Sequence, residues 1–267
     1  MGFAMKTHIY SIAGEVKGDI DLGGLFKHSV RTDLITRAFL AEQSKFRQPY
    51  GVDPLAGKRT SAHYHGRRGI RQSMMNKEMA RMPRIHGQGY LNFTARFVPQ
   101  AIKGRKAHPP LAEKIWKQKI NKKEMRKALL SAISATAMKD MVLARGHAIN
   151  GLNLPIVIED KFEELKKAKE VADVFEKIGL KDEIKRVGKR KVRSGKGKLR
   201  SRRYREKKGP LIIVKEDKGI IAAAKNIPGC DAVTVKGLTI NLLAPGSHPG
   251  RLCIWTKSAF EEAEKLA

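Results

Sequence analysis

The chain has 267 residues, 41 % of them hydrophobic, which is enough for one large domain or two average ones with a sizeable core. The chain has 55 Lys and Arg against 26 Asp and Glu, which gives a net charge of +29. This charge favours a polyanionic partner, and nucleic acid is favoured over an anionic membrane surface. Charge, Pro or Gly interrupts every apolar stretch too early for a membrane span, and Cys230 and Cys253 are too few and too far apart for a disulfide framework or a zinc cluster. We therefore expect a soluble, cytoplasmic, polyanion-binding protein.

The N-terminal part predicts a strand and then a helix. Thr7–Ile12 has the pattern of a short strand, and Gly14 and Gly18 mark turns after it. Thr32 or Asp33 is placed to cap a helix, because the apolar residues that follow recur at helical spacing.

The C-terminal part alternates apolar runs with helical patterns. Asn121 caps a helix, with Glu124 three residues on as in a capping box. The expected strands are Pro155–Ile158, Leu211–Val214, Ala232–Val235 and Leu252–Trp255. The expected helices between and after them are Lys161–Ile178, Asp217–Lys225 and Ser258–Ala267, the last opened by a capping box from Ser258 to Glu261. Short apolar strands with helices between them predict an α/β fold with a doubly wound, mainly parallel sheet and helices on both faces.

Two segments hold most of the positive charge. Residues 47–108 carry a net charge of +11, and residues 185–208 carry +13, so together they supply +24 of the total. The rest of the chain has the charge balance of an ordinary globular domain. Blocks of like charge are typical of solvated interaction segments, and here both lie between predicted folded elements.

The first segment predicts a long, extended, basic loop insertion. It has scattered Gly and Pro and no sustained helical or strand period, and connections longer than about 15 residues are uncommon in compact domains. We expect a globular α/β domain of residues 1–48 and 109–267, an extended RNA-penetrating loop of residues 49–108, and a second basic RNA-binding loop of residues 185–208. Each limb of about 30 residues reaches at most about 100 Å.

Aromatic residues interleave with arginines in the first segment, which favours folded RNA as the partner. DNA is not expected, because the sequence has no helix-turn-helix, zinc-finger or basic-zipper pattern. The residues expected to bind RNA are Lys58, Arg59, His63, Arg67, Arg68, Arg71, Arg81, Arg84, His86, Arg96, Lys103, Arg105 and Lys106 in the first segment and Lys189, Arg190, Lys191, Arg193, Lys196, Lys198, Arg200, Arg202, Arg203 and Arg205 in the second.

The sequence contains only poor matches to known nucleotide-binding and metal-binding motifs. Gly51–Arg59 has five residues between its glycines, lacks Ser or Thr after Lys58, and follows no strand, so it does not fit a phosphate loop. His63 and His65 have a spacing found in metal sites, but in an extended chain they point to opposite faces and no third ligand cluster lies nearby in sequence. We expect them to contact phosphate or base edges.

Two further motifs are possible catalytic candidates. Glu159 and Asp160 follow a strand, where α/β enzymes keep catalytic groups, but acids that balance a helix dipole explain them better. Ser247 and His248 lie in a Gly- and Pro-rich loop and lack the spacing of a nucleophile elbow. We therefore expect no catalytic residue, no metal and no cofactor.

Seven blocks of the sequence resemble a known family, large-subunit ribosomal protein four in its archaeal and eukaryotic form. The blocks are DPLAGKRTSAHYHG (53–66), RMPRIHGQG (81–89), GRKAHPP (104–110), NKKEMRKALLSAISATA (121–137), KVRSGKGKLRSRRY (191–204), KNIPGCDAV (225–233) and LLAPGSHPGRLCIWTKSAF (242–260). Eukaryotic members continue beyond the last helix, so a chain that stops at Ala267 is expected to be archaeal.

The resemblance implies a non-enzymatic constituent of the large ribosomal subunit that binds 23S-type ribosomal RNA and aids assembly. It implies neighbouring large-subunit proteins, including the tunnel protein of the number-twenty-two family, and a long loop whose tip contacts the nascent peptide in the exit tunnel. The expected tip is Arg81, Pro83, Arg84, Ile85, His86, Gly87, Gln88 and Gly89. The alternative is an RNA-modifying enzyme, methyltransferase-like, with an α/β core.

Overall fold

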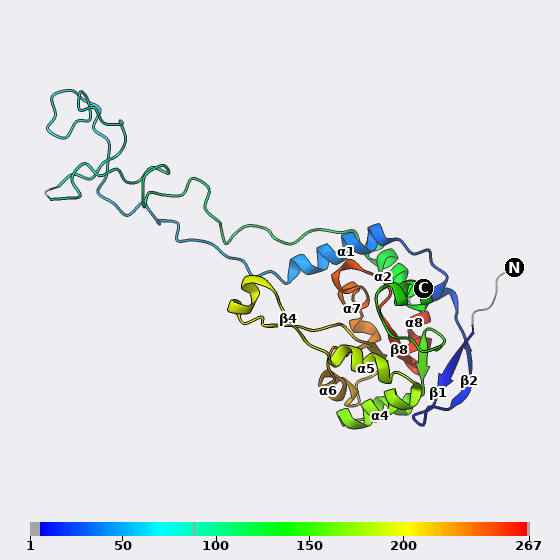
Figure 1. Cartoon of the computed structure of the whole chain (residues 1–267). Coiled ribbons are helices and arrows are strands. Elements are labelled where there is room, and N and C mark those ends of the chain that lie inside the picture. The colour runs from blue at the N-terminus through cyan, green and yellow to red at the C-terminus, as the bar shows by residue number, and fades with distance from the viewer. Residues whose placement is uncertain (1–5, 88, 266–267) are drawn as a thin grey trace. The chain divides into compact units, whose positions relative to one another are not determined.

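Six strands form one mixed sheet in the order β2-β1-β3-β8-β6-β7 in the computed structural model, which describes residues 6–87 and 89–265 (Figure 1). The strands of this sheet are β1 (Lys6–Tyr10), β2 (Val16–Asp21), β3 (Ile156–Ile158), β6 (Leu211–Val214), β7 (Asp231–Thr234) and β8 (Cys253–Thr256). β2 runs antiparallel to β1, and all other neighbours in the sheet are parallel. The predicted α/β class with a mainly parallel sheet is confirmed.

The central strands are buried on both sides. Every residue of β3, β6 and β8 is buried, and successive side chains enter two different hydrophobic clusters. Leu211 and Ile213 belong to one cluster, and Ile212 and Val214 belong to the other. A continuous apolar run with this alternation is what a parallel strand between two covering layers requires.

Eight α-helices accompany the sheet in the described residues. They are α1 (Thr32–Lys45), α2 (Lys122–Ala137), α3 (Lys139–Ala144), α4 (Ala168–Ile178), α5 (Lys181–Gly188), α6 (Ile220–Lys225), α7 (Ile240–Leu243) and α8 (Lys257–Glu264). Residues of α1, α2, α7 and α8 enter the cluster around Trp255, whereas residues of α4 and α6 enter the cluster around Ile212 (Figure 1). None of the described helices combines the length and the apolar character that crossing a bilayer demands.

One strand of the six-stranded sheet, β2, was not predicted. Gly14 is a turn residue with a φ of 88°, as expected, but Gly18 lies inside β2 and pairs with Ile9. The prediction of a turn at Gly18 is therefore wrong. β2 carries charged residues and exposes most of its side chains, so it lacked the apolar pattern that identified the other strands.

The helix starts differ from the predicted caps. Asn121 precedes α2 as expected but its side chain makes no capping hydrogen bond, and Arg31, rather than Thr32 or Asp33, precedes α1. The predicted capping box at Ser258 is also wrong. Thr256 precedes α8, and its hydroxyl accepts a hydrogen bond from the Ala259 N–H.

Two predicted helices are shorter than expected. The Lys161–Ile178 pattern divides into the 3-10 helix η2 (Asp160–Glu164) and α4. The Asp217–Lys225 pattern becomes α6 only from Ile220, because the Asp217 carboxylate accepts hydrogen bonds from the Gly219 and Ile221 N–H groups and forms a turn first.

The second basic segment begins inside a helix. Residues 185–188 are the last turn of α5, a helix that was not predicted, and Val187 is buried there. Beyond it lies a two-stranded antiparallel hairpin of β4 (Lys191–Val192) and β5 (Tyr204–Arg205), joined through the 3-10 helix η3 (Gly195–Arg200). Three shorter 3-10 helices complete the described elements: η1 (Gly24–Phe26), η4 (Val235–Gly237) and η5 (Pro245–Ser247).

Residues 47–116 form a separate unit, distinct from the unit of residues 1–46 and 117–267. Its described residues contain no helix or strand, only isolated bridges of Arg84 to His63 and to Ala95. Its two ends are joined by Trp116, whose ring stacks on Tyr50 at 5.6 Å between centroids and lies under the Arg47 guanidinium at 4.4 Å. This contact extends the unit eight residues past the predicted loop end at residue 108.

Candidate nucleic-acid interface

The unit of residues 47–116 has almost no core. Among its described residues, the buried hydrophobic side chains are Ala62 and Met74. Its exposed large hydrophobic residues are Tyr50, Val52, Leu55, Tyr64, Ile70, Met79, Tyr90, Leu91, Phe97, Ile102, Leu111 and Ile115. A unit that exposes this much apolar surface gains little stability from its own burial.

Most of the predicted RNA-binding cations of this unit are exposed. The exposed ones are Lys58, Arg59, Arg67, Arg68, Arg71, Arg81, Lys103 and Lys106, and Arg105 is half-buried. Arg59 forms an ion pair with Asp53 at 2.5 Å, which is one of the few acids in the unit. The remaining charge is therefore mainly uncompensated within the unit.

Two predicted RNA-binding arginines instead make contacts within the loop. The guanidinium of Arg84 donates to the Phe93 carbonyl at 2.7 Å and to the Ala80 carbonyl at 3.0 Å. The guanidinium of Arg96 donates to the Ile102 carbonyl. Both side chains are half-buried, so they support the loop backbone.

The loop backbone adopts conformations that side chains disfavour. The non-glycine residues with positive φ in this unit are Asn76, Glu78, Phe93, Phe97 and Lys103, with φ between 51° and 74°. Left-handed conformations of this kind persist only when surrounding contacts hold them. Close approach also needs glycine, because a Cβ on Gly104 would lie 1.9 Å from the Val98 carbonyl oxygen.

The predicted tip contains one residue that requires glycine. Gly89 has a φ of 94°, and its carbonyl accepts a hydrogen bond from the Asn92 N–H at 3.1 Å. Gly87 is exposed without positive φ, and Gln88 lies outside the described residues. Tyr90, beside this turn, exposes 93 % of its side chain and is available to stack on an unpaired base.

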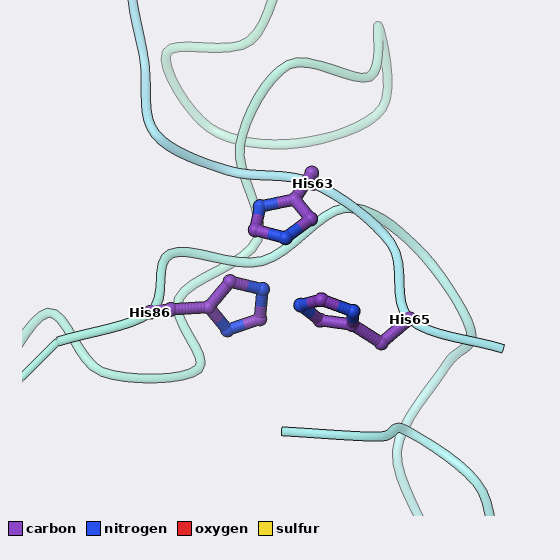
Figure 2. Close-up of side chains that lie close together, drawn as sticks. All are labelled: His63, His65 and His86. Carbon is purple, nitrogen blue, oxygen red and sulfur yellow. The ribbon is translucent and has the colours of Figure 1, made fainter. Parts of the chain in front are cut away.

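The three histidines of the loop converge. The ring centroids of His63 and His65 lie 4.1 Å apart, and His86 lies 4.4 Å and 4.6 Å from them (Figure 2). The prediction that His63 and His65 point to opposite faces is wrong, because this segment pairs only through the isolated bridge of His63 to Arg84 and is not a regular strand. Sequence spacing gave no signal for His86 as a third member.

The cations of the second segment lie on and around the hairpin. Lys189, Arg190, Lys191, Arg193, Lys196, Lys198, Arg200, Arg202, Arg203 and Arg205 are all exposed. Arg193 donates to the Arg202 carbonyl at 3.0 Å and holds the two limbs together, and Arg190 pairs with Glu206 at 3.0 Å. The others present their charge to solvent.

A basic groove of about 950 Å³ lies beside this hairpin. Its lining includes Arg145, Arg186, Lys189, Lys191, Arg205, Lys207, Lys208 and the loop of Pro245, Gly246, His248 and Pro249. Arg145 and His248 were not among the predicted binding residues, because they lie about 40 residues on either side of the basic run in the sequence. Only the fold brings them to it.

Arg145 is held rigidly in the groove wall. Its guanidinium donates to the Pro245 carbonyl at 2.9 Å and to the His248 carbonyl. Burial foremost, and then the nearby Arg251 and Arg186, lower the pKa of Arg145 to about 10. The side chain therefore stays charged at neutral pH, and an anion in the groove would relieve the repulsion that it experiences.

A buried ion cluster positions Arg186 in the same groove. The Glu183 carboxylate, fully buried, accepts from Arg186 at 2.7 Å, from the His147 ring at 2.7 Å and from the Ala148 N–H at 3.0 Å. Burial alone would raise the pKa of Glu183, but these hydrogen bonds outweigh it and hold the pKa at about 2. Arg186 also donates to the Lys208 carbonyl, so the cluster fixes one edge of the groove.

The acidic residues weighed as catalytic candidates have structural partners. Glu159 accepts from the Ile12 N–H at 3.0 Å and pairs with Lys17 at 2.5 Å. Asp160 accepts from the Ser258 N–H at 2.8 Å. These carboxylates join neighbouring elements of the α/β unit, which differs in detail from the predicted role of balancing a helix dipole.

Comparisons with known proteins agree along the chain. A family model described as ribosomal protein L4/L1 family matches residues 20–266. A protein of Archaeoglobus fulgidus named large ribosomal subunit protein uL4 is 48 % identical over 258 residues, 96 % of this chain and 97 % of that protein. Proteins of the same name from Methanosphaera stadtmanae and Methanocaldococcus jannaschii are 46 % and 45 % identical, each over 98 % of this chain and over 97 % and 99 % of their own lengths.

Proposed function

The chain belongs to the ribosomal protein L4/L1 family, and we propose from this premise that it is a non-enzymatic structural constituent of the large ribosomal subunit, in the cytoplasm. It binds large-subunit ribosomal RNA. The rival RNA-modifying enzyme is set aside on the family membership and on the relatives' names.

The observation that carries this function is the unit of residues 47–116. It has a large positive charge, exposed aromatic residues and a buried apolar core of two side chains. Such a unit gains its order from an anionic partner that surrounds it. Folded RNA fits, because phosphates take the exposed Lys and Arg and unpaired bases stack on residues such as Tyr90.

The mechanism is electrostatic and steric. Exposed cations on the loop and the hairpin neutralise phosphates that RNA folding brings together, and counterions are released. The basic groove adds Arg145 and Arg186, each held in place by protein contacts and so arranged before RNA arrives. Arg84 and Arg96 act indirectly, since they hold the loop that carries the phosphate contacts.

The proposed architecture has three parts. Residues 1–48 and 109–267 are a doubly wound α/β domain with helices on both faces of the sheet, residues 49–108 are the long extended loop that enters RNA, and residues 185–208 neutralise phosphate near the domain. The two clusters that flank β6 support the doubly wound reading. The lack of helix and strand in residues 47–116 supports the loop.

The tip from Arg81 to Gly89 is proposed to line the peptide exit tunnel. There it meets the nascent peptide and the tunnel protein of the number-twenty-two family. The turn at Gly89 and the exposed Tyr90 support a tip at this place. Photocrosslinkers at Arg81 and Tyr90 should react with a stalled nascent chain, and a crosslinker at Arg200 should not. The opposite pattern would exchange the roles of the two segments.

The RNA-binding proposal is tested by salt dependence. Changing Arg200, Arg202, Arg203 and Arg205 to Ala should lower the slope of log K against log salt by about 3–4, because each phosphate contact adds about 0.7–0.9. A matched control changes four exposed lysines elsewhere, Lys161, Lys167, Lys169 and Lys177, to Ala. Equal slopes for the two variants on a 23S-type RNA fragment would remove the hairpin from the interface.

A further inference from the structure

The three loop histidines have the arrangement of a metal site. One ring nitrogen of each histidine lies within 4.8 Å of the corresponding nitrogens of the other two, although His86 is 21 residues beyond His65 in the chain. Figure 2 shows the three rings directed toward a common centre. The cluster contains three histidines and no acidic side chain, so no ion pair explains the grouping.

The histidine nitrogens are available as ligands. Both ring nitrogens of His86 are inaccessible to solvent and have no hydrogen-bond partner among the described residues. Within the described residues no other group competes with a metal ion for these two nitrogens. A neutral imidazole offers the lone pair that a metal ion requires.

His63 is already oriented for ligation. Its Nδ1 lies 3.2 Å from the Ser61 carbonyl oxygen, and the Nδ1–H donates to it. This hydrogen bond leaves the lone pair on Nε2. Metal-binding histidines characteristically donate their second nitrogen to a carbonyl or carboxylate in this way.

The backbone holds the three residues in register. The Arg84 N–H donates to the His63 carbonyl at 3.2 Å, and the Met74 N–H donates to the His65 carbonyl at 3.4 Å. Next to His86, Ile85 exchanges hydrogen bonds with the Phe93–Thr94 segment at 3.0 Å each. The three ligands thus lie on segments that hydrogen-bond to other parts of the loop.

We propose that His63, His65 and His86 bind one divalent transition-metal ion and that this ion is zinc. Three neutral nitrogen donors suit zinc, whereas calcium and magnesium take oxygen ligands. Zn–N bonds of about 2.0–2.1 Å in tetrahedral geometry bring the nitrogens to about 3.4 Å from one another. Three protein ligands would leave the fourth tetrahedral position to a water molecule.

The ion would act as a staple for a unit without a core. It joins the segment of residues 63–65 to residue 86, and small units with little buried apolar surface commonly use a metal for this purpose. This role does not depend on RNA binding. If the free chain bound zinc but did not bind RNA, the zinc-site proposal would stand and the proposed RNA-binding function would be contradicted.

The test uses the full, untagged chain, freed of metal with a chelator and titrated with zinc in calorimetry. We expect one equivalent of zinc per chain, and tetrahedral absorption bands when cobalt replaces zinc. His65→Ala should weaken binding by about 100-fold or more, since even loss of an outer-shell partner costs 10–100-fold. His65→Cys should restore it, because a thiolate is also a zinc ligand. His108→Ala, an exposed histidine of the same unit, should bind as the parent does.

Zinc should also slow tryptic cleavage at Arg81 in the parent and in His65→Cys but leave it unchanged in His65→Ala. Circular dichroism of the α/β unit should be the same in all variants. Together the two measurements distinguish a variant that has lost the ion from a variant that has lost its fold. Absence of stoichiometric binding, half an equivalent per chain, or an equal loss in His108→Ala would overturn the proposal.

Discussion

The two units of the chain differ in how many apolar side chains they bury. In the α/β unit, β6 and β8 bury all of their residues between two hydrophobic clusters. In the described part of residues 47–116 the buried apolar side chains are Ala62 and Met74, and the other contacts include backbone hydrogen bonds, arginine–carbonyl bonds and the ring contacts of Trp116. The difference teaches that one chain can combine a unit with its own core and a unit without one, and for the second unit we propose that a bound partner supplies the order.

The largest expected effect separates the two tryptophans of the chain. Trp255 is fully buried and packs edge-on against Phe26 at 6.2 Å, so Trp255→Ala should lower the free energy of unfolding of the α/β unit by about 3–5 kcal/mol. Trp116→Ala, in the coreless unit, should leave the main unfolding transition within about 0.5 kcal/mol. Urea denaturation of the RNA-free protein measures both, and equal losses would contradict the contrast.

A smaller effect is expected at the buried ion cluster. Glu183→Gln removes a carboxylate that Arg186, His147 and the Ala148 N–H all contact, and it should cost about 2–3 kcal/mol. The cost should appear in the α/β unit alone. Glu176→Gln, an exposed acid of the neighbouring helix α4, is the control and should be nearly neutral.

The same cluster sets a pH dependence. The pKa of Glu183 is held at about 2, below its ordinary value of 4.5, so its stabilisation is complete above about pH 4.5 and is lost as the pH falls toward 2. Burial lowers the pKa of His147, which gives a loss of the same sign on acidification. Glu183→Gln should therefore flatten the acid limb of stability against pH, and an unchanged limb would show that Glu183 is not the group responsible.

The next effect concerns a helix start. The Thr256 hydroxyl accepts from the Ala259 N–H and donates to Glu163, so Thr256→Val should cost about 1–2 kcal/mol. Thr256→Ser keeps the hydroxyl and should lose less than half of that. If both variants lose the same amount, methyl packing rather than capping is responsible.

The smallest stability effect is expected in the loop. Changing Arg67, Arg68 and Arg71 to Gln should alter the unfolding free energy by less than about 0.5 kcal/mol, because all three are exposed. The same variant should lower the salt slope of RNA binding by about 2–3. A stability loss without a change of slope would place these arginines in the structure of the free protein.

The sequence predicted the fold where burial leaves a pattern. Leu211–Val214 was predicted with its observed bounds, because a strand between two layers is a continuous apolar run. β2 and α5 were missed, since an edge strand and a short surface helix are largely charged and their positions depend on neighbours. The predicted helix cap, Ser258, lies two residues beyond the observed cap, Thr256. Both residues carry a hydroxyl group, and only the backbone geometry decides which of them caps the helix.

The sequence predicted which segments of the nucleic-acid interface are positively charged, but it did not predict which side chains come together there. The exposed cations of both segments follow directly from composition. The convergence of His86 on His63 and His65 depends on the pairing of Arg84 with two other segments, and the place of Arg145 in the groove depends on the tertiary fold. Neither arrangement can be predicted from the spacing of residues along the sequence.

The central claim, that residues 47–116 take their order from a partner, is tested most directly by hydrogen exchange. Amides are compared in the metal-free, RNA-free protein and in assembled large subunits. In the free protein, β6 and β8 amides should be strongly protected, while the Arg84 and Ile85 amides should exchange nearly as fast as an unstructured chain; in the subunit both sets should be protected. Equal protection of both sets in the free protein would contradict the account.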